Sequence, residues 1–186
     1  MDRQLQALAE IRTFLIQHGI RYVVIGGIAN AIWGRPRGTL DADLKVLLGD
    51  MSIHAFVELL GSAFRFRVPD PLPFVRRTYV APILASNDVG LDLVLGFLPY
   101  EVETVERAIL VQYHGVAFSV CTAEDLIIHK AISERPKDWA DIEGILARQA
   151  SALDQPYIMR WLEEFSRALE RPELIQQYQE LLSRLP

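Results

Sequence analysis

The chain has 186 residues, 51% of them hydrophobic, and a formal net charge of −5 at pH 7. This length is enough for one domain, or a small domain with an appendage, and for a substantial buried core. The acidic balance argues against a dedicated, non-specific nucleic-acid binder, which would need broad positive potential, although a local basic patch remains compatible with it.

Cysteine content and hydropathy indicate the compartment. Cys121 is the only cysteine, so no internal disulfide can form, and we expect its side chain to be a small buried hydrophobe. No apolar run approaches the length needed to cross a bilayer, and the first residues lack the apolar core of a signal peptide. We therefore expect a soluble, cytoplasmic protein with no membrane partner.

The first part of the chain alternates between helical and strand patterns. In chain order, we expect a helix over 5–15 stopped by Gly19, a strand over 22–25, a helix over 28–33, a strand over 40–46 and a helix over 52–60. The alternation predicts an α/β arrangement for this part.

The middle of the chain has mainly strand-like patterns. Region 64–95 is strand-like throughout, with 79–84 and 89–95 as the better candidates. Pro82 weakens the first candidate or makes it an edge strand. A short helix is expected beyond Tyr100, and two strands are expected around His114-Gly115 as a hairpin, over 109–113 and 116–120.

From Thr122 onward the pattern predicts helices only. Thr122 and Asp125 have the spacing of an N-terminal capping box with a shorter acid, and Pro136 suits the first turn of a helix that ends near 148. Two apolar stripes follow at helical spacing: Tyr157, Trp161, Phe165 and Leu169, then Leu174, Tyr178, Leu181 and Leu185. The junction between the α/β part and the helical part is expected near Cys121.

Two carboxylates stand two residues apart in the segment 40–46. On a strand, the period of two places Asp41, Asp43 and Lys45 on one face. Carboxylates held side by side repel each other, and a divalent cation such as Mg²⁺ or Mn²⁺ is the simplest compensation for oxygen ligands. The alternative is a half-exposed strand that carries two aspartates by chance, and the Asp-x-Asp pattern alone favours that alternative.

Asp92 is a third carboxylate, within the otherwise apolar segment 89–95. Burying an unpaired carboxylate is costly, and a metal or another cation removes that cost. If this strand lies beside the Asp41 strand, Asp92 becomes a third metal ligand, or the base that accepts a hydroxyl proton. The structural alternative is an edge strand with Asp92 in water, but Val94 on the same face favours the functional interpretation.

Gly26-Gly27 ends one expected strand and opens a helix, where free backbone N–H groups can bind phosphate oxygens. Glycine is common at such turns, and the pair is neither a P-loop nor a dinucleotide-binding fingerprint. Arg37 and Thr39, just before the carboxylates, could contact phosphate. As an alternative, Arg37 pairs with Asp41 or Asp43.

Residues 130–141 place three cations and three acids around a turn between helices. Lys130 could reach a nucleotide triphosphate. Asp138 and Asp141 share one helix face near its N-terminus, where acids are favoured in any case. Structural ion pairs account for these residues equally well.

The chain also has a group of arginines close in sequence: Arg65, Arg67, Arg76 and Arg77, which Arg35 and Arg37 could join in space. This group is either a basic patch for a nucleic acid or a solvated charged rim, and the sequence leaves both open. The histidines and the single cysteine show no zinc-site spacing.

Taken in order, these motifs resemble those of the DNA polymerase β-like nucleotidyltransferase superfamily. The resemblance spans roughly residues 20–150 and consists of Gly26-Gly27, a short helix, Arg37-x-Thr39-x-Asp41-x-Asp43, Asp92 in a later strand, and Lys130 followed by Arg135-x-Lys137-Asp138-x-x-Asp141. Within that superfamily, the chain is most similar to the small AbiEii-like nucleotidyltransferases associated with bacterial toxin–antitoxin and phage-defence systems. Where the family often has serine after the first glycine, this chain has Gly27.

The resemblance implies an α/β (α+β) fold, with a minimal nucleotidyltransferase palm of mixed sheet and flanking helices over 1–121 and a helical bundle over 122–186. It implies that Asp41, Asp43 and Asp92 are catalytic and bind Mg²⁺ or Mn²⁺. Gly26, Gly27 and Lys130 would bind the NTP, with Arg37 and Thr39 as further candidate contacts. The implied reaction is attack of an acceptor hydroxyl on the α-phosphate, with pyrophosphate leaving.

Three functions compete. The leading hypothesis is an active nucleotidyltransferase whose acceptor is an RNA end or a protein hydroxyl. If the protein is a toxin, we expect it to have a cognate antitoxin. The second is transfer to a small molecule, as in aminoglycoside or lincosamide nucleotidyltransferases. The third is a catalytically silent nucleotide-binding module, against which the three candidate carboxylates argue.

Overall fold

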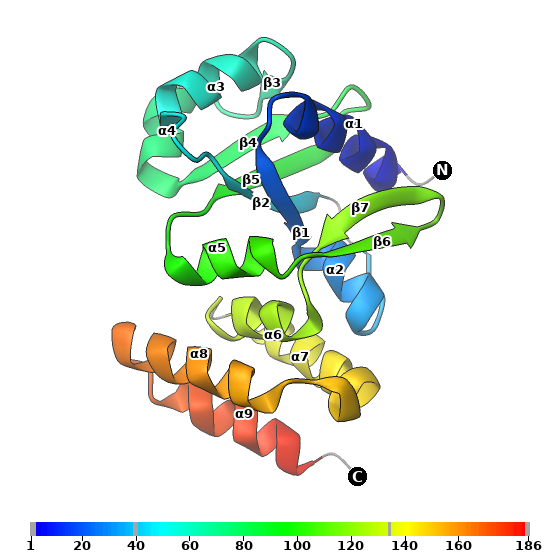
Figure 1. Ribbon diagram of the computed structural model, residues 1–186, viewed down its shortest axis with the longest axis vertical. Coiled ribbons are helices and arrows are strands. Elements are labelled where there is room, and N and C mark those ends of the chain that lie inside the picture. The colour runs from blue at the N-terminus through cyan, green and yellow to red at the C-terminus, as the bar shows by residue number, and fades with distance from the viewer. Residues whose placement is uncertain (1–2, 39–40, 134, 185–186) are drawn as a thin grey trace. The chain divides into compact units, whose positions relative to one another are not determined.

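The computed structural model describes residues 3–38, 41–133 and 135–184 (Figure 1). Backbone contacts divide the chain into two compact units. The first comprises Met1–Ile28 and Gly38–Cys121, and the second comprises Ala29–Arg37 and Thr122–Pro186. The sequence-based division into 1–121 and 122–186 assigned residues 29–37 to the first part, and as a statement about domains it stays a prediction.

The first unit is built on a seven-stranded mixed sheet in the order β3-β4-β5-β2-β1-β7-β6. The strands are β1 Arg21–Ile25, β2 Ala42–Leu47, β3 Arg65–Phe66, β4 Val80–Leu84, β5 Gly90–Leu95, β6 Ile109–Tyr113 and β7 Val116–Val120. The pairs β2/β5 and β1/β7 are parallel, and the other neighbours are antiparallel. This mixed sheet confirms the predicted α/β fold class.

Helices α1 Arg3–Gln17, α3 Ile53–Gly61, α4 Pro71–Thr78 and α5 Pro99–Glu106 belong to the first unit, and α2 Gly26–Trp33 begins in it. The core combines alternate residues of the central strands, among them Leu44, Val46 and Leu93, with Leu8 and Ile11 of α1, all fully buried. The expected hairpin forms as β6 and β7, and His114 and Gly115 adopt the positive φ angles that its tight turn requires.

One expected strand region contains a helix instead. Residues 71–78 were predicted to be strand-like, but they form α4. Pro71 occupies the first turn, where its missing N–H costs nothing, and Arg76 and Arg77 lie in the last turn, where cations are favoured. Buried Val75 anchors this helix, so a single apolar position, too few for a periodic signal, holds it in place.

Pro82 lies inside β4, which is flanked by β3 and β5, so β4 is not an edge strand. The carbonyl oxygen of Pro82 accepts a hydrogen bond from the Arg67 amide at 2.9 Å, just beyond the two-residue strand β3. In an antiparallel ladder a residue's N and O point to the same neighbour. The missing N–H of Pro82 therefore faces the end of β3, where little pairing is lost.

The second unit is helical. It contains most of α2, then α6 Ala123–Ala131, α7 Pro136–Gln149, the 3-10 turn Ala150–Ala152, α8 Gln155–Ala168 and α9 Glu173–Ser183. Thr122 caps α6 as predicted, because its side-chain oxygen accepts a hydrogen bond from the Asp125 amide. Helices α8 and α9 run side by side in opposite directions (Figure 1). Tyr178 of α9 is fully buried, and its hydroxyl donates to Gln155 of α8 at 2.8 Å. Among the described residues, no helix combines the length and apolarity that a bilayer crossing demands.

A buried ion pair links β2 to α5 in the first unit. Lys45 is 4% exposed, and its ammonium pairs with the Glu101 carboxylate. Glu101 also accepts hydrogen bonds from the backbone amides of Phe97 and Leu98. Burial raises the pKa of Glu101, but the Lys45 charge and these hydrogen bonds outweigh it, so the pKa lies below its ordinary value of 4.5.

Replacing Glu101 with glutamine should lower the free energy of unfolding at pH 7 by about 3 kcal/mol, because Lys45 would stay buried without its countercharge. The lowered pKa means that this stabilisation is complete above pH 4.5 and is lost as the pH falls through the pKa of the folded state. Urea denaturation of both proteins from pH 7 downward should show the difference shrinking below pH 4.5.

Glu106→Gln is the matched control. Glu106 lies on the same helix, and its pair with Arg21 at 3.5 Å is solvent exposed, so its loss should change stability by less than about 0.5 kcal/mol. Equal losses in the two variants at pH 7 would contradict a stabilising role for the buried pair.

Candidate functional site

Three aspartates of the first unit gather where β2 and β5 run parallel. Asp43 is the register partner of Asp92 on β5 and of Ile25 on β1. Asp41 directly precedes β2, and the period of two places it on the same face as Asp43. The condition on which the role of Asp92 depended is therefore met: its strand lies beside the Asp41–Asp43 strand.

Gly26 joins this group from the end of β1. It has a φ of +65°, and a Cβ built on it would lie 2.0 Å from Oδ2 of Asp43. Asp43 thus rests against the backbone at the start of α2, where only glycine fits. Gly27 is the second residue of α2, and the first-turn amides of a helix have no partner within the helix. Carboxylate and helix start therefore lie side by side, as a metal–phosphate site would need.

Arg67 lies on two of the three carboxylates. Its Nη1 is 3.3 Å from Oδ2 of Asp41, and its Nη2 pairs with Oδ1 of Asp92. All three side chains are partly exposed, with between 28% and 39% of their surface accessible. The sequence grouped Arg67 with other arginines and indicated no acidic partner for it. A usable signal was present, because Arg65-x-Arg67 has the same strand spacing as Asp41-x-Asp43.

The donor set suits a hard divalent cation. Asp41, Asp43 and Asp92 offer only carboxylate oxygens, the ligands that Mg²⁺ and Mn²⁺ prefer. A cationic group, the Arg67 guanidinium, already lies against two of them. Among the described side chains, no three His, Cys, Asp or Glu residues converge tightly enough to hold one metal ion. The residues therefore fit the implied metal in chemistry.

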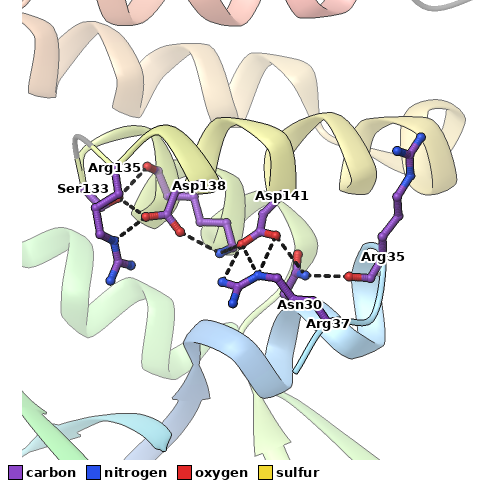
Figure 2. A network of polar contacts seen from close by, with 8 residues as sticks. Asn30, Arg35, Arg37, Ser133, Arg135, Asp138 and Asp141 are labelled. Atoms are coloured by element: carbon purple, nitrogen blue, oxygen red, sulfur yellow. Dashed lines mark hydrogen bonds and ion pairs between the residues drawn. The ribbon is translucent and has the colours of Figure 1, made fainter. Parts of the chain in front are cut away.

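The second unit contains the residues predicted around the helix turn, in a polar network (Figure 2). The Lys130 ammonium donates to Asp138 Oδ1 at 3.0 Å and to Asp141 Oδ2 at 2.6 Å. The Arg37 guanidinium makes a two-nitrogen contact with Asp141, through Nε at 3.0 Å and Nη2 at 2.9 Å. Ser133 and Arg135 donate to the other oxygen of Asp138.

The network keeps both of its carboxylates ionised. Burial raises the pKa of Asp138 and of Asp141, but hydrogen bonds and charges outweigh it, so both pKa values lie below the ordinary 3.8. For Asp138 the donors are Ser133, Arg135 and Lys130, and for Asp141 they are Arg37 and Lys130. The structural ion pairs that the sequence offered as one interpretation are thus present.

The predicted nucleotide contacts in this unit remain predictions. The Lys130 side chain is only 5% exposed, whereas that of Arg37 is 35% exposed. Arg37 pairs with Asp141, 104 positions along the chain, and its pairing with Asp41 or Asp43 stays a prediction. Thr39 lies outside the described residues. Asn30, which sequence reasoning missed, donates from Nδ2 to Asp141 at 3.3 Å and to the Arg35 carbonyl at 2.9 Å.

The arginines of the predicted basic patch are divided among different contacts. Arg65 pairs with Asp88 at 2.6 Å, and both side chains are 71% exposed. The Arg77 guanidinium lies 5.9 Å from the centre of the Phe74 ring. Because Arg65 and Arg67 both have carboxylate partners, part of the positive charge that an RNA would meet is already neutralised.

No protein-family model matches the chain, and no curated protein is similar to it in sequence. Solved structures with the same fold exist. An antigenic nucleotidyltransferase-like protein from Paracoccidioides brasiliensis is 15% identical, with a TM-score of 0.55 over 95% of this chain and 92% of that one. The antibiotic-resistance factor ANT(2'')-Ia is 13% identical, with a TM-score of 0.58 over 90% of this chain and 95% of that one.

These similarities confirm the fold that the motif order implied. They extend over nearly the whole of each chain, so the helical second unit is included in the likeness. At this identity they establish the fold alone, and they do not test the narrower AbiEii-like resemblance. The chain has the fold of nucleotidyltransferase-like proteins.

Proposed function

We propose that this protein is a nucleotidyltransferase that uses Mg²⁺ or Mn²⁺ to move a nucleoside monophosphate from an NTP to an acceptor hydroxyl. The observation that carries the proposal is the register of Asp43 with Asp92 beside the glycine that opens α2. The fold shared with nucleotidyltransferase-like proteins supports it.

Each candidate site residue of the first unit that the sequence named has a role in this proposal. Asp41, Asp43 and Asp92 would hold the metal, which when bound neutralises phosphate charge and polarises the α-phosphate. Gly26 and Gly27 would present first-turn amides to the triphosphate. Asp92 would accept the proton of the acceptor hydroxyl. The oxygen of that hydroxyl would form a bond to the α-phosphorus as the bond from the α-phosphorus to the leaving pyrophosphate breaks in line.

Further contacts to the nucleotide belong to the proposal as well. Arg37 and Thr39 are candidates because they stand just before the carboxylates in the sequence. The resemblance assigns Lys130 to phosphate binding, although Lys130 would have to share its ammonium with two aspartates. An NTP titration of Lys130→Gln tests this assignment, with the exposed Lys137→Gln as its control.

The acceptor follows from the resemblance and from charge. The AbiEii-like resemblance favours an RNA end or a protein hydroxyl, in a toxin–antitoxin or phage-defence setting with a cognate antitoxin. A small cationic acceptor such as an aminoglycoside is the second candidate, favoured by the net charge of −5 and by the paired state of Arg65 and Arg67. Incubation with each α-labelled NTP, Mg²⁺ and tRNA, protein extract or aminoglycosides separates them.

Asp43→Asn is expected to reduce transfer about a thousand-fold, because it removes one metal-binding carboxylate at almost unchanged size and with it about 4 kcal/mol of transition-state stabilisation. The measurement is the rate of label transfer from the NTP to the acceptor identified with the wild-type protein. Asp50→Asn, at an exposed loop position, should keep the wild-type rate. Transfer that survives Asp43→Asn, or no transfer by wild type to any acceptor, would sink the catalytic proposal and leave the silent module.

Gly26→Ala is expected to abolish most transfer, chiefly through a steric clash. The added methyl would overlap Oδ2 of Asp43 and displace that carboxylate, in addition to straining a backbone with φ of +65°. Gly19→Ala is a close control, because Gly19 has the same φ of +65° and no atom within 4 Å of the added methyl.

Both glycine variants should lose about 1 kcal/mol of stability from backbone strain, measured by urea denaturation. Only Gly26→Ala should lose transfer by tenfold or more, measured with the same labelled NTP. Equal activity of the two variants would show that the closeness of Gly26 to Asp43 has no part in the chemistry.

A further inference from the structure

Backbone pairing in the sheet places Arg67 in line with Asp92 and Asp43 across neighbouring strands. Its amide donates to the Pro82 carbonyl at 2.9 Å, Pro82 is the register partner of Asp92, and Asp92 is the register partner of Asp43. Directly opposed residues in a sheet point to the same face. The backbone therefore aims Arg67 across Pro82 toward the carboxylates.

The guanidinium bridges two carboxylates instead of clamping one. Nη1 contacts Asp41 and Nη2 contacts Asp92, so the cation lies between two strands that both carry proposed metal ligands. Arg65, two residues earlier, makes an ordinary exposed pair with Asp88. The bridging contact distinguishes Arg67 from Arg65, although the two arginines stand two residues apart in the chain.

Gly90 provides the space for this bridge. A Cβ on Gly90 would lie 2.3 Å from Oδ1 of Asp41 and 3.2 Å from Nη1 of Arg67. The φ of Gly90 is not in the left-handed region, so the backbone itself would accept other residues. Space for Asp41 and Arg67 is the reason for glycine at this position, which indicates a built contact and not a chance surface pair.

The charge balance explains why such a cation is needed and why it can be exchanged. Three carboxylates close together destabilise one another when ionised, and one guanidinium offsets a single charge. A divalent ion offsets two at a shorter distance to each oxygen. Since the bridge is about one-third exposed, water screens it and its release costs little compared with that of a buried pair.

We propose that Arg67 is a positioning residue that occupies the place of the divalent cation, holding Asp41 and Asp92 together until the metal displaces it. The inference rests on the proposed function, because it requires that these aspartates bind a metal. Arg67 then competes with the metal and sets its affinity, so the site binds metal more weakly than its carboxylates alone would.

The test is Mn²⁺ binding, followed by electron paramagnetic resonance of free Mn²⁺, in wild type and Arg67→Gln. Removal of a cation in direct contact with two of the ligands should tighten Mn²⁺ binding roughly tenfold. In EDTA the same variant should have a lower melting temperature than wild type, and saturating Mn²⁺ should raise its melting temperature by more than it raises that of wild type. A merely structural arginine would lower stability without tightening metal binding.

Two further variants keep the result interpretable. Arg67→Lys retains the charge and loses the two-pronged bridge, so its Mn²⁺ affinity should lie between those of wild type and Arg67→Gln. Arg65→Gln removes an arginine two residues earlier in the chain and should leave Mn²⁺ affinity within about twofold of wild type.

Each outcome has one meaning. Unchanged or weaker Mn²⁺ binding by Arg67→Gln, with wild type binding normally, overturns the inference while the proposed function stands. If wild type binds no Mn²⁺ at millimolar concentration and Asp43→Asn behaves identically, the metal-dependent function itself has failed. Tighter binding by Arg65→Gln to the same extent would reduce the effect to general charge and overturn the specific role of Arg67.

Discussion

The parallel pairing of β2 with β5 in a register that opposes Asp43 to Asp92 is the constraint on which the candidate site depends. It places two carboxylates side by side on neighbouring strands, whose backbones lie about 4.8 Å apart. Such a pair is unfavourable unless a cation or donor groups compensate it. Arg67 supplies a compensating positive charge to Asp41 and Asp92. Gly26 and Gly90 leave space for the side chains of Asp43 and Asp41.

Strand β2 contains a second charged contact of the opposite character, two residues further along. The side chains of Lys45 and Glu101 are 6% and 15% exposed, and Glu101 is also held by two backbone amides. Breaking such a pair leaves an uncompensated buried charge, so it behaves as a permanent part of the fold. The Arg67 bridge is partly solvated, and in our proposal its partners Asp41 and Asp92 exchange this cation for a metal. A fixed charge pair on β2 thus lies close along the chain to Asp41, a partner in the proposed exchangeable contact.

Local patterns in the sequence predicted what local physics determines. The period of two placed Asp41 and Asp43 on one face, the interrupted apolar run identified Asp92, and turn residues located the β6–β7 hairpin. Helix α4 was missed because Val75 is its single buried residue, which gives no periodic signal. Pro82 suggested an edge strand, and the structure instead directs its missing donor toward the end of β3.

Partnerships over long sequence distances were beyond the reach of those patterns. Arg37 and Asp141 are 104 residues apart, and Arg67 and Asp92 are 25 apart. A cation in a loop has many acids within its possible reach, and only the folded backbone selects among them. The sequence could therefore name the charged residues of both clusters, but it could not say which charge compensates which.

Lys130 shows why that distinction matters for function. Its ammonium joins Asp138 and Asp141, which are almost inaccessible, and both carboxylates have lowered pKa values. If Lys130 moved toward a phosphate, two buried carboxylates would lose a donor, a cost that Arg37 and Arg135 could offset only in part. The side chains of Arg37 and Arg135 are 35% and 60% exposed, so they can meet an anion while keeping their aspartates. If the second unit contacts a phosphate, we therefore expect Arg37 and Arg135 to reach it before Lys130, which holds the carboxylates that position these arginines.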